Sequence, residues 1–95
     1  MPLKQKSIPK KGISEESTYF HEFKLFSKKV RNNILELRKK KNMTQEQMQD
    51  YELNLRQFQR IESGETENIT LSSLFRIAKA FQITPAELID VIKKS

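Results

Sequence analysis

Residues 44–64 hold two short amphipathic segments separated by only a few residues, and each segment begins with residues that cap helices. Thr44 with Gln47 three positions later matches a capping box, in which each side chain bonds the other residue's backbone N–H. Asn54 with Gln57 resembles a second capping box. One helical segment precedes this pair and two follow it. The sequence therefore predicts two helices joined by a tight turn within an all-helical chain.

The second of these segments has two chemically different sides. Phe58 and Ile61, at positions i and i+3, share one side and are expected to point inward. The opposite side carries guanidinium and amide groups, which are free to face outward. A helix with such a face, held by a tight turn, is what a helix-turn-helix needs to enter a DNA major groove. The outward residues are Arg56, Gln57, Gln59 and Arg60.

The segment before residue 44 is predicted to be helical from Ser14 or Ser17 up to the lysine run 39–41, with Asn42 as a left-handed stop. Residues 14–25 either form a separate helix with a bend near Ser27 or continue into one long helix. Their aromatic side chains need cover, either from the chain's own core or from a second subunit. The apolar stripe recurs at steps of three and four, at Phe23, Phe26, Val30, Ile34 and Leu37.

The remaining elements are predicted from caps and apolar faces. A second helix is expected at about residues 45–51 and a third at about residues 55–63, ended by Gly64. Thr70 caps a fourth, and Thr84 with Pro85 starts a fifth. No useful strand-like alternation appears, so the count is five helices, or six. The residues expected inward are Met48 and Tyr51 in the second helix, Leu71, Leu74, Phe75, Ile77, Ala78 and Phe81 in the fourth, and Leu88, Ile89 and Ile92 in the fifth.

The charge of the chain is unevenly distributed. The net charge is +6, yet residues 43–95 carry eight acidic and six basic side chains. Residues 1–13 contain four lysines and no acid, which predicts a flexible basic tail. Residues 14–25 are then a helical extension, and residues 26–92 the main domain. A positive balance favours a polyanionic partner but does not identify one, so the local placement of arginines carries that argument.

Three strings in this order and spacing, LRKKKNMTQEQ, RIESG and TLSSLFRIAKAFQITPAELI, give the chain a specific resemblance. Over roughly residues 26–89 it resembles the lambda repressor/Cro-type (XRE family) helix-turn-helix transcriptional regulators. The resemblance implies a compact five-helix bundle in which residues 55–63 form the recognition helix. It also implies double-stranded DNA as the partner, and a homodimer acting as a repressor or autoregulator on a palindromic operator.

Carried over from the family, the base-reading positions fall on Leu55 and Arg56, with Arg60 one turn later. Arg56 can donate two hydrogen bonds to a guanine, which makes it the best candidate for reading sequence. Gln57 is a further candidate for a base edge. For Leu55, half-buried packing is expected rather than a thymine contact.

A second group of residues is expected to position the protein on phosphate, without choosing sequence. Gln45 matches the family glutamine at the start of the second helix, where backbone N–H groups and the helix dipole favour an anion. Arg38 and Glu62 match a family ion pair that holds the recognition helix against the first helix. The residues assigned to phosphate or to positioning are Thr44, Gln45, Asn54, Gln59 and Asn68.

The chain departs from the family pattern at the turn and in the loop after the third helix. The segment 44–60 is one residue shorter than usual, Gln49 replaces a small residue, and Glu52 stands where a glycine is common. The loop 65–67 carries two glutamates where cations commonly grip the DNA backbone. These acids are expected to weaken affinity or to move phosphate contacts to backbone amides near Asn68.

Other classes of function fit the composition less well. Without cysteine, and with His21 as the single histidine, the chain lacks the residues of a metal centre or a catalytic triad, and no glycine-rich phosphate loop is present. An enzyme, a cofactor and a small-molecule ligand are therefore not expected. The chain contains no apolar run of about 18 residues, so a membrane span is not expected, and a cytoplasmic location is the default. The alternative function is an antitoxin or other interaction module that masks a toxin-like protein.

Overall fold

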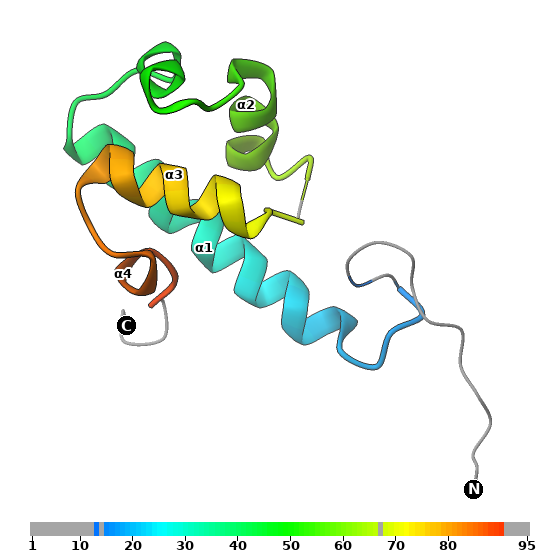
Figure 1. Cartoon of the computed structure of the whole chain (residues 1–95). Helices are drawn as coiled ribbons and strands as arrows, with labels where there is room; N and C mark the ends of the chain where they lie inside the picture. The colour runs from blue at the N-terminus through cyan, green and yellow to red at the C-terminus, as the bar shows by residue number, and fades with distance from the viewer. Residues whose placement is uncertain (1–12, 14, 67, 91–95) are drawn as a thin grey trace, which may run out of the picture.

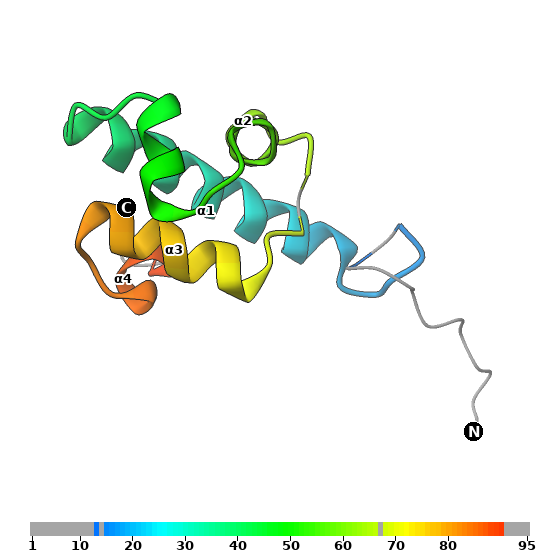
Figure 2. The same ribbon diagram turned by 45° about the horizontal axis from the view of Figure 1, so that its top comes forward.

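A single long helix, α1 (Phe20–Lys40), supports the other elements (Figure 1). α2 (Leu55–Ser63), α3 (Leu71–Phe81) and α4 (Pro85–Ile89) all pack against it, while its first turns extend past them, as Figure 1 and Figure 2 both show. A 3₁₀ helix, η1 (Glu46–Tyr51), lies between α1 and α2 in sequence and packs on α2 and α3. This computed structural model describes residues 13, 15–66 and 68–90. Those residues contain no strand, so the prediction of an all-helical bundle is confirmed.

The start of α1 differs from the prediction. The helix begins at Phe20 and runs unbroken through Ser27, so there is neither a start at Ser17 nor a bend. Ser17 instead forms a turn, because its Oγ accepts from the Tyr19 N–H at 3.1 Å and its carbonyl accepts from the Phe20 N–H at 3.2 Å. Such local bonds compete with helix formation. Ser14 and almost all of the predicted tail 1–13 lie outside the described residues.

The core lies where the C-terminal half of α1 meets the other helices. Seven large side chains are almost completely buried there, and all of them had been predicted to face inward. Asn33 adds a buried polar link, since its Nδ2 donates to the Leu88 carbonyl at 2.8 Å and satisfies an oxygen at the end of α4. The seven are Ile34, Met48, Phe58, Ile61, Ile77, Phe81 and Leu88.

Several residues predicted to be buried lie at the surface. Leu71 and Phe75 are 82% and 51% exposed, because they lie at i and i+4 on a side of α3 that its neighbours do not cover. Tyr51 is exposed as well, and Leu53, two residues on, is buried in the core instead. The predicted apolar stripe of the fourth helix was therefore wider than the real one.

The apolar stripe of α1 also runs beyond the core. Val30 and Ile34 are buried, but Phe26 is 42% exposed. Ile89 is exposed too, and with Phe23 and Phe26 it lines a shallow apolar groove. The prediction that Ile89 is buried was wrong, and Ile92 lies outside the described residues. For the aromatic segment that ends at Phe26, cover from the core or from a second subunit was left open, and the core covers Phe26 only in part.

The helix caps follow the sequence closely. Gln47 N–H donates to Thr44 Oγ1 at 3.1 Å, and Thr44 N–H donates to Gln47 Oε1 at 2.8 Å, which completes the predicted capping box. Thr84 forms the same reciprocal box at α4. Asn54 Oδ1 accepts from the Gln57 N–H at 3.0 Å and caps α2. Gly64 ends α2 at φ 85°, the left-handed conformation that favours glycine.

The shortened turn explains why the second element is not an α-helix. η1 has six residues in 3₁₀ conformation. A 3₁₀ helix rises about 2.0 Å per residue against about 1.5 Å for an α-helix, so η1 covers roughly the length of a longer α-helical segment. Glu52 then takes the left-handed conformation with φ 64°. A glutamate is strained there, whereas the glycine common at this position would not be.

Candidate nucleic-acid interface

The outward side of α2 is a polar surface on a firmly anchored helix. Phe58 and Ile61 bury its inner side almost completely, while Leu55 is half-buried at its start. The exposed side presents two guanidinium groups and two amides at Arg56, Gln57, Gln59 and Arg60. This arrangement matches the two-sided pattern predicted from the sequence. Because the core holds the helix, its polar side chains project from a fixed position.

The two arginines of this face have different surroundings. Arg56 forms neither a hydrogen bond nor an ion pair with any residue that the structure describes. Arg60 lies beside Glu65, with 3.8 Å between Nε and Oε2, and both side chains are well exposed. An exposed pair of this kind is worth about 0–1 kcal/mol. Both guanidinium groups can therefore turn toward a ligand, but Arg60 carries a carboxylate next to it.

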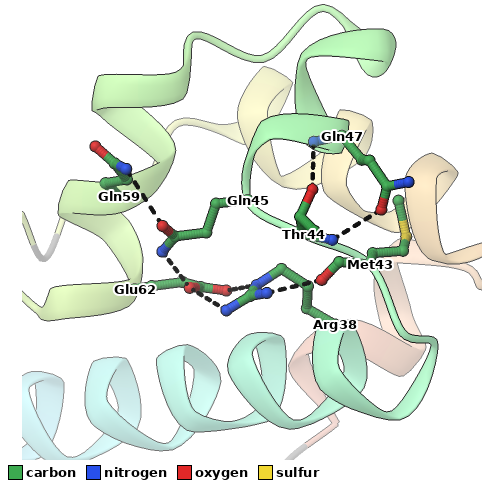
Figure 3. A network of polar contacts seen from close by, with 7 residues as sticks. All are labelled: Arg38, Met43, Thr44, Gln45, Gln47, Gln59 and Glu62. Carbon is green, nitrogen blue, oxygen red and sulfur yellow. Dashed lines mark hydrogen bonds and ion pairs between the residues drawn. The ribbon is translucent and has the colours of Figure 1, made fainter.

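A buried ion pair fixes α2 on α1 (Figure 3). Arg38 Nε donates to Glu62 Oε2 at 2.7 Å, and Arg38 Nη2 donates to Glu62 Oε1 at 3.1 Å. The Arg38 and Glu62 side chains are only 12% and 4% exposed. Arg38 Nη1 also donates to the Met43 carbonyl at 2.7 Å, which ties down the chain just before η1. The two-pronged geometry and low exposure make this the strongest polar link among the described residues.

The same carboxylate also connects η1 to α2. Gln45 Nε2 donates to Glu62 Oε1 at 2.8 Å, and Gln59 Nε2 donates to Gln45 Oε1 at 3.3 Å (Figure 3). One network therefore runs from the exposed face of α2 through the start of η1 to α1. It holds the two helices of the helix-turn-helix in a fixed relation.

The structure places the predicted positioning residues in more than one environment. The side-chain oxygens of Thr44 and Asn54 accept hydrogen bonds from the backbone N–H groups of Gln47 and Gln57 and so act as helix caps. Gln45 uses both ends of its amide within the network, so it is pre-oriented and its backbone N–H remains at the start of η1. Asn68 is exposed and lines the apolar groove near Phe26.

The links that Gln45 makes to Glu62 and Gln59 were not predicted. Gln45 and Glu62 are separated by 17 positions, and only the packing of η1 on α2 brings them together. Polar residue type alone does not distinguish an amide that waits for a ligand from one already bonded within the protein. The described residues contain no His, Asp and Glu cluster able to hold a metal ion. None of the helices described is both long and apolar enough to span a membrane.

Comparison with protein families gives an independent result. Residues 33–94 match the model of the Cro/C1-type HTH DNA-binding domain. This range contains η1, α2, α3, α4 and the C-terminal part of α1, while the first turns of α1 precede it. Comparison with curated proteins and with solved structures gave no match. The chain therefore belongs to the family of Cro/C1-type helix-turn-helix DNA-binding domains, and its partner is DNA.

Proposed function

We propose that this protein is a sequence-specific transcriptional regulator, a repressor or autoregulator, that reads the major groove with α2. The observation behind the proposal is the guanidinium of Arg56, which has no partner among the described residues and lies on the exposed side of a helix whose other side is buried. Arg56 is the base reader, because a guanidinium bonds guanine O6 and N7 together. That contact discriminates against other bases by about 1–3 kcal/mol.

The other residues of the surface have supporting roles. Arg60 and Gln57 reach base edges further along α2, and Leu55 packs at its start. Gln45, with its backbone N–H at the start of η1, approaches a phosphate, supported by Thr44, Asn54, Gln59 and Asn68. Glu65 opposes binding, because its carboxylate lies beside Arg60 and repels phosphate.

The protein acts as a homodimer, with its two recognition helices about one DNA turn, roughly 34 Å, apart. Exposed apolar side chains on the first turns of α1 support a second copy as their cover. Phe26 is 42% exposed and lines the shallow apolar groove together with Phe23 and Ile89, and the neighbouring Leu25 is 62% exposed. Burying such side chains against another subunit is favourable because it removes apolar area from water.

Selection from a pool of random duplexes tests the reading function. The full chain should enrich a palindromic site whose half-sites are about one helical turn apart. Binding to that site should weaken steeply as salt rises, because phosphate neutralisation releases counterions. Failure to enrich any sequence over the starting pool would contradict the proposal.

The dimer is tested separately, by light scattering and by DNA titration of a Phe26→Gln variant. The variant should be monomeric and should bind the selected site with lower affinity and without cooperativity. Phe75→Gln is the matched control, since Phe75 is as exposed as Phe26 but lies beside Tyr51 on another side of the molecule. A wild-type monomer that binds no selected site but captures a second protein would favour the interaction-module function instead.

A further inference from the structure

The N-terminal half of α1 carries a row of cations that faces the end of α2. Lys24, Lys28 and Arg31 are spaced at i, i+4 and i+7, which places them on one side of the helix. Together with Leu25 and Ser27 of α1, and with Ser63 and Gly64 at the end of α2, they line a groove between the two helices. The groove joins cations from one element to the end of the proposed recognition helix.

These cations are not neutralised within the part of the chain that the structure describes. Lys28 and Arg31 form no ion pair there, and Lys24 has only the Phe20 ring under its Nζ, at 5.4 Å. Like charges at i and i+4 destabilise a helix by a few tenths of a kcal/mol. A row of three cations therefore costs stability unless an anion binds beside it.

Arg31 is held close to the backbone at the edge of this groove. A Cβ built on Gly64 would lie 3.0 Å from both Cζ and Nε of Arg31, so the guanidinium rests against a residue that has no side chain. The end of α2 thus leaves room for the arginine. Its charge is kept next to the C-terminal end of α2.

The groove continues the exposed row of α2. Arg56, Arg60 and Ser63 lie at i, i+4 and i+7, so the row that contains the proposed base reader ends at the groove. Residues 43–95, which include all of α2, carry more acidic than basic side chains. Attraction to phosphate must therefore come largely from outside this half of the chain.

We propose that the groove formed by Lys24, Lys28, Arg31, Ser63 and Gly64 binds the DNA backbone next to the bases that α2 reads. The inference rests on the proposed function, and it assigns further phosphate contacts to three cations of α1 that precede the family match. The cations contact phosphate oxygens and add affinity without choosing sequence. The site thereby offsets the repulsion between DNA phosphates and the acidic side chains of residues 43–95.

The test compares two charge-matched double variants, Lys24→Gln/Lys28→Gln in the groove and Lys29→Gln/Lys79→Gln away from it. Lys29 is the neighbour of Lys28 on the same helix and is exposed but does not line the groove. Each variant is titrated with the selected duplex and with a scrambled duplex of equal length, over a range of salt concentrations. Melting temperatures should show that all variants are folded, because the substituted lysines are exposed.

The groove variant should bind both duplexes roughly tenfold more weakly at low salt, with the ratio between the duplexes unchanged. The slope of log affinity against log salt should become shallower by about 2, one unit for each lost phosphate contact. The control variant should change both quantities much less. Equal losses in the two variants, or an unchanged salt slope, would overturn the proposal.

This outcome is separate from that of the reading function. If the wild type does not prefer any selected duplex over the scrambled one, the reading function fails, while the groove is still judged on the scrambled duplex. Phosphate ethylation interference gives a second readout for the groove. Ethylation that blocks the wild type but not the groove variant should map to phosphates outside the bases read by α2, and its absence would contradict the groove.

Discussion

The two halves of α1 have opposite characters, although they form one continuous helix. From Val30 onward, α1 is fixed to the bundle by buried Ile34, by the Asn33 bond to α4 and by the Arg38–Glu62 pair. Before Val30, large apolar side chains are exposed and cations lack acidic partners among the described residues. The first half therefore contributes little to folding, and its side chains remain available for binding.

The difference shows how a small domain separates stability from recognition. In the C-terminal half, Asn33 and Arg38 are bonded within the protein, and the Arg38–Glu62 pair orients α2. In the N-terminal half, Lys24 and Lys28 form no ion pair with the described residues and Phe26 is partly exposed, and we infer that DNA and a second copy contact them. Substitutions in the two halves should accordingly affect different measurements.

The largest contrast is expected between Ile34→Ala and Leu25→Ala. Ile34 is fully buried, and its truncation should cost about 2–5 kcal/mol through lost burial and a cavity. Leu25 is 62% exposed, and its truncation should change stability by less than about 0.5 kcal/mol. Urea unfolding of dilute protein measures both, so that association does not add to stability. Similar losses of unfolding free energy in the two variants would contradict the division of α1 into a packed half and an exposed half.

The next effect tests the polar link in the packed half. Arg38→Met should cost about 3 kcal/mol, because it leaves the Glu62 carboxylate buried without its cation. Adding Glu62→Met should recover part of that loss, as expected for coupled neighbours. The control is Arg76→Met, since the exposed Arg76–Glu52 pair, 3.5 Å apart, should be worth less than about 1 kcal/mol. Additive losses at Arg38 and Glu62 would rule out the coupling.

A smaller effect is expected at Gly64, the residue at the end of α2 that lies against Arg31, close to the junction of the two halves of α1. Gly64→Ala should cost about 1–2 kcal/mol, because a Cβ is disfavoured at φ 85°. The new Cβ also approaches Arg31, but the guanidinium is the end of a flexible side chain and can move. Thermal unfolding should therefore show the same cost in an Arg31→Ala background. A cost that disappears in that background would mean that the contact, not the backbone, sets the penalty.

Much of the fold could be predicted because local signals and tertiary packing agree. The caps at Thr44, Asn54 and Thr84 fixed where helices begin, and the apolar steps in α2 identified Phe58 and Ile61 as buried. Sequence periodicity did not predict burial correctly where burial depends on which other element packs against the helix. Leu71 and Phe75 carry the right spacing for a core position, but both are exposed because the neighbouring elements leave that side of α3 open.

The candidate site was predictable in a similar way. The exposed face of α2 followed from periodicity, and the Arg38–Glu62 pair followed from resemblance to the family. The bonds of Gln45 and the groove beside Arg31 did not follow, because they join residues that only the packing of η1 and α1 against α2 brings together. The turn at Glu52 was predicted only in part. The sequence indicated a shortened turn, but it did not indicate that η1 would be a 3₁₀ helix instead of an α-helix.

The central claim is that Arg56 on α2 reads a base. Its most direct test is the affinity of wild type and Arg56→Ala for the selected duplex and for every single-base variant of one half-site. The wild type should lose about 1–3 kcal/mol when the guanine that Arg56 contacts is replaced. Arg56→Ala should bind all four bases at that position equally and keep its discrimination elsewhere. An Arg56→Ala variant with the same discrimination as the wild type at every position would contradict the account.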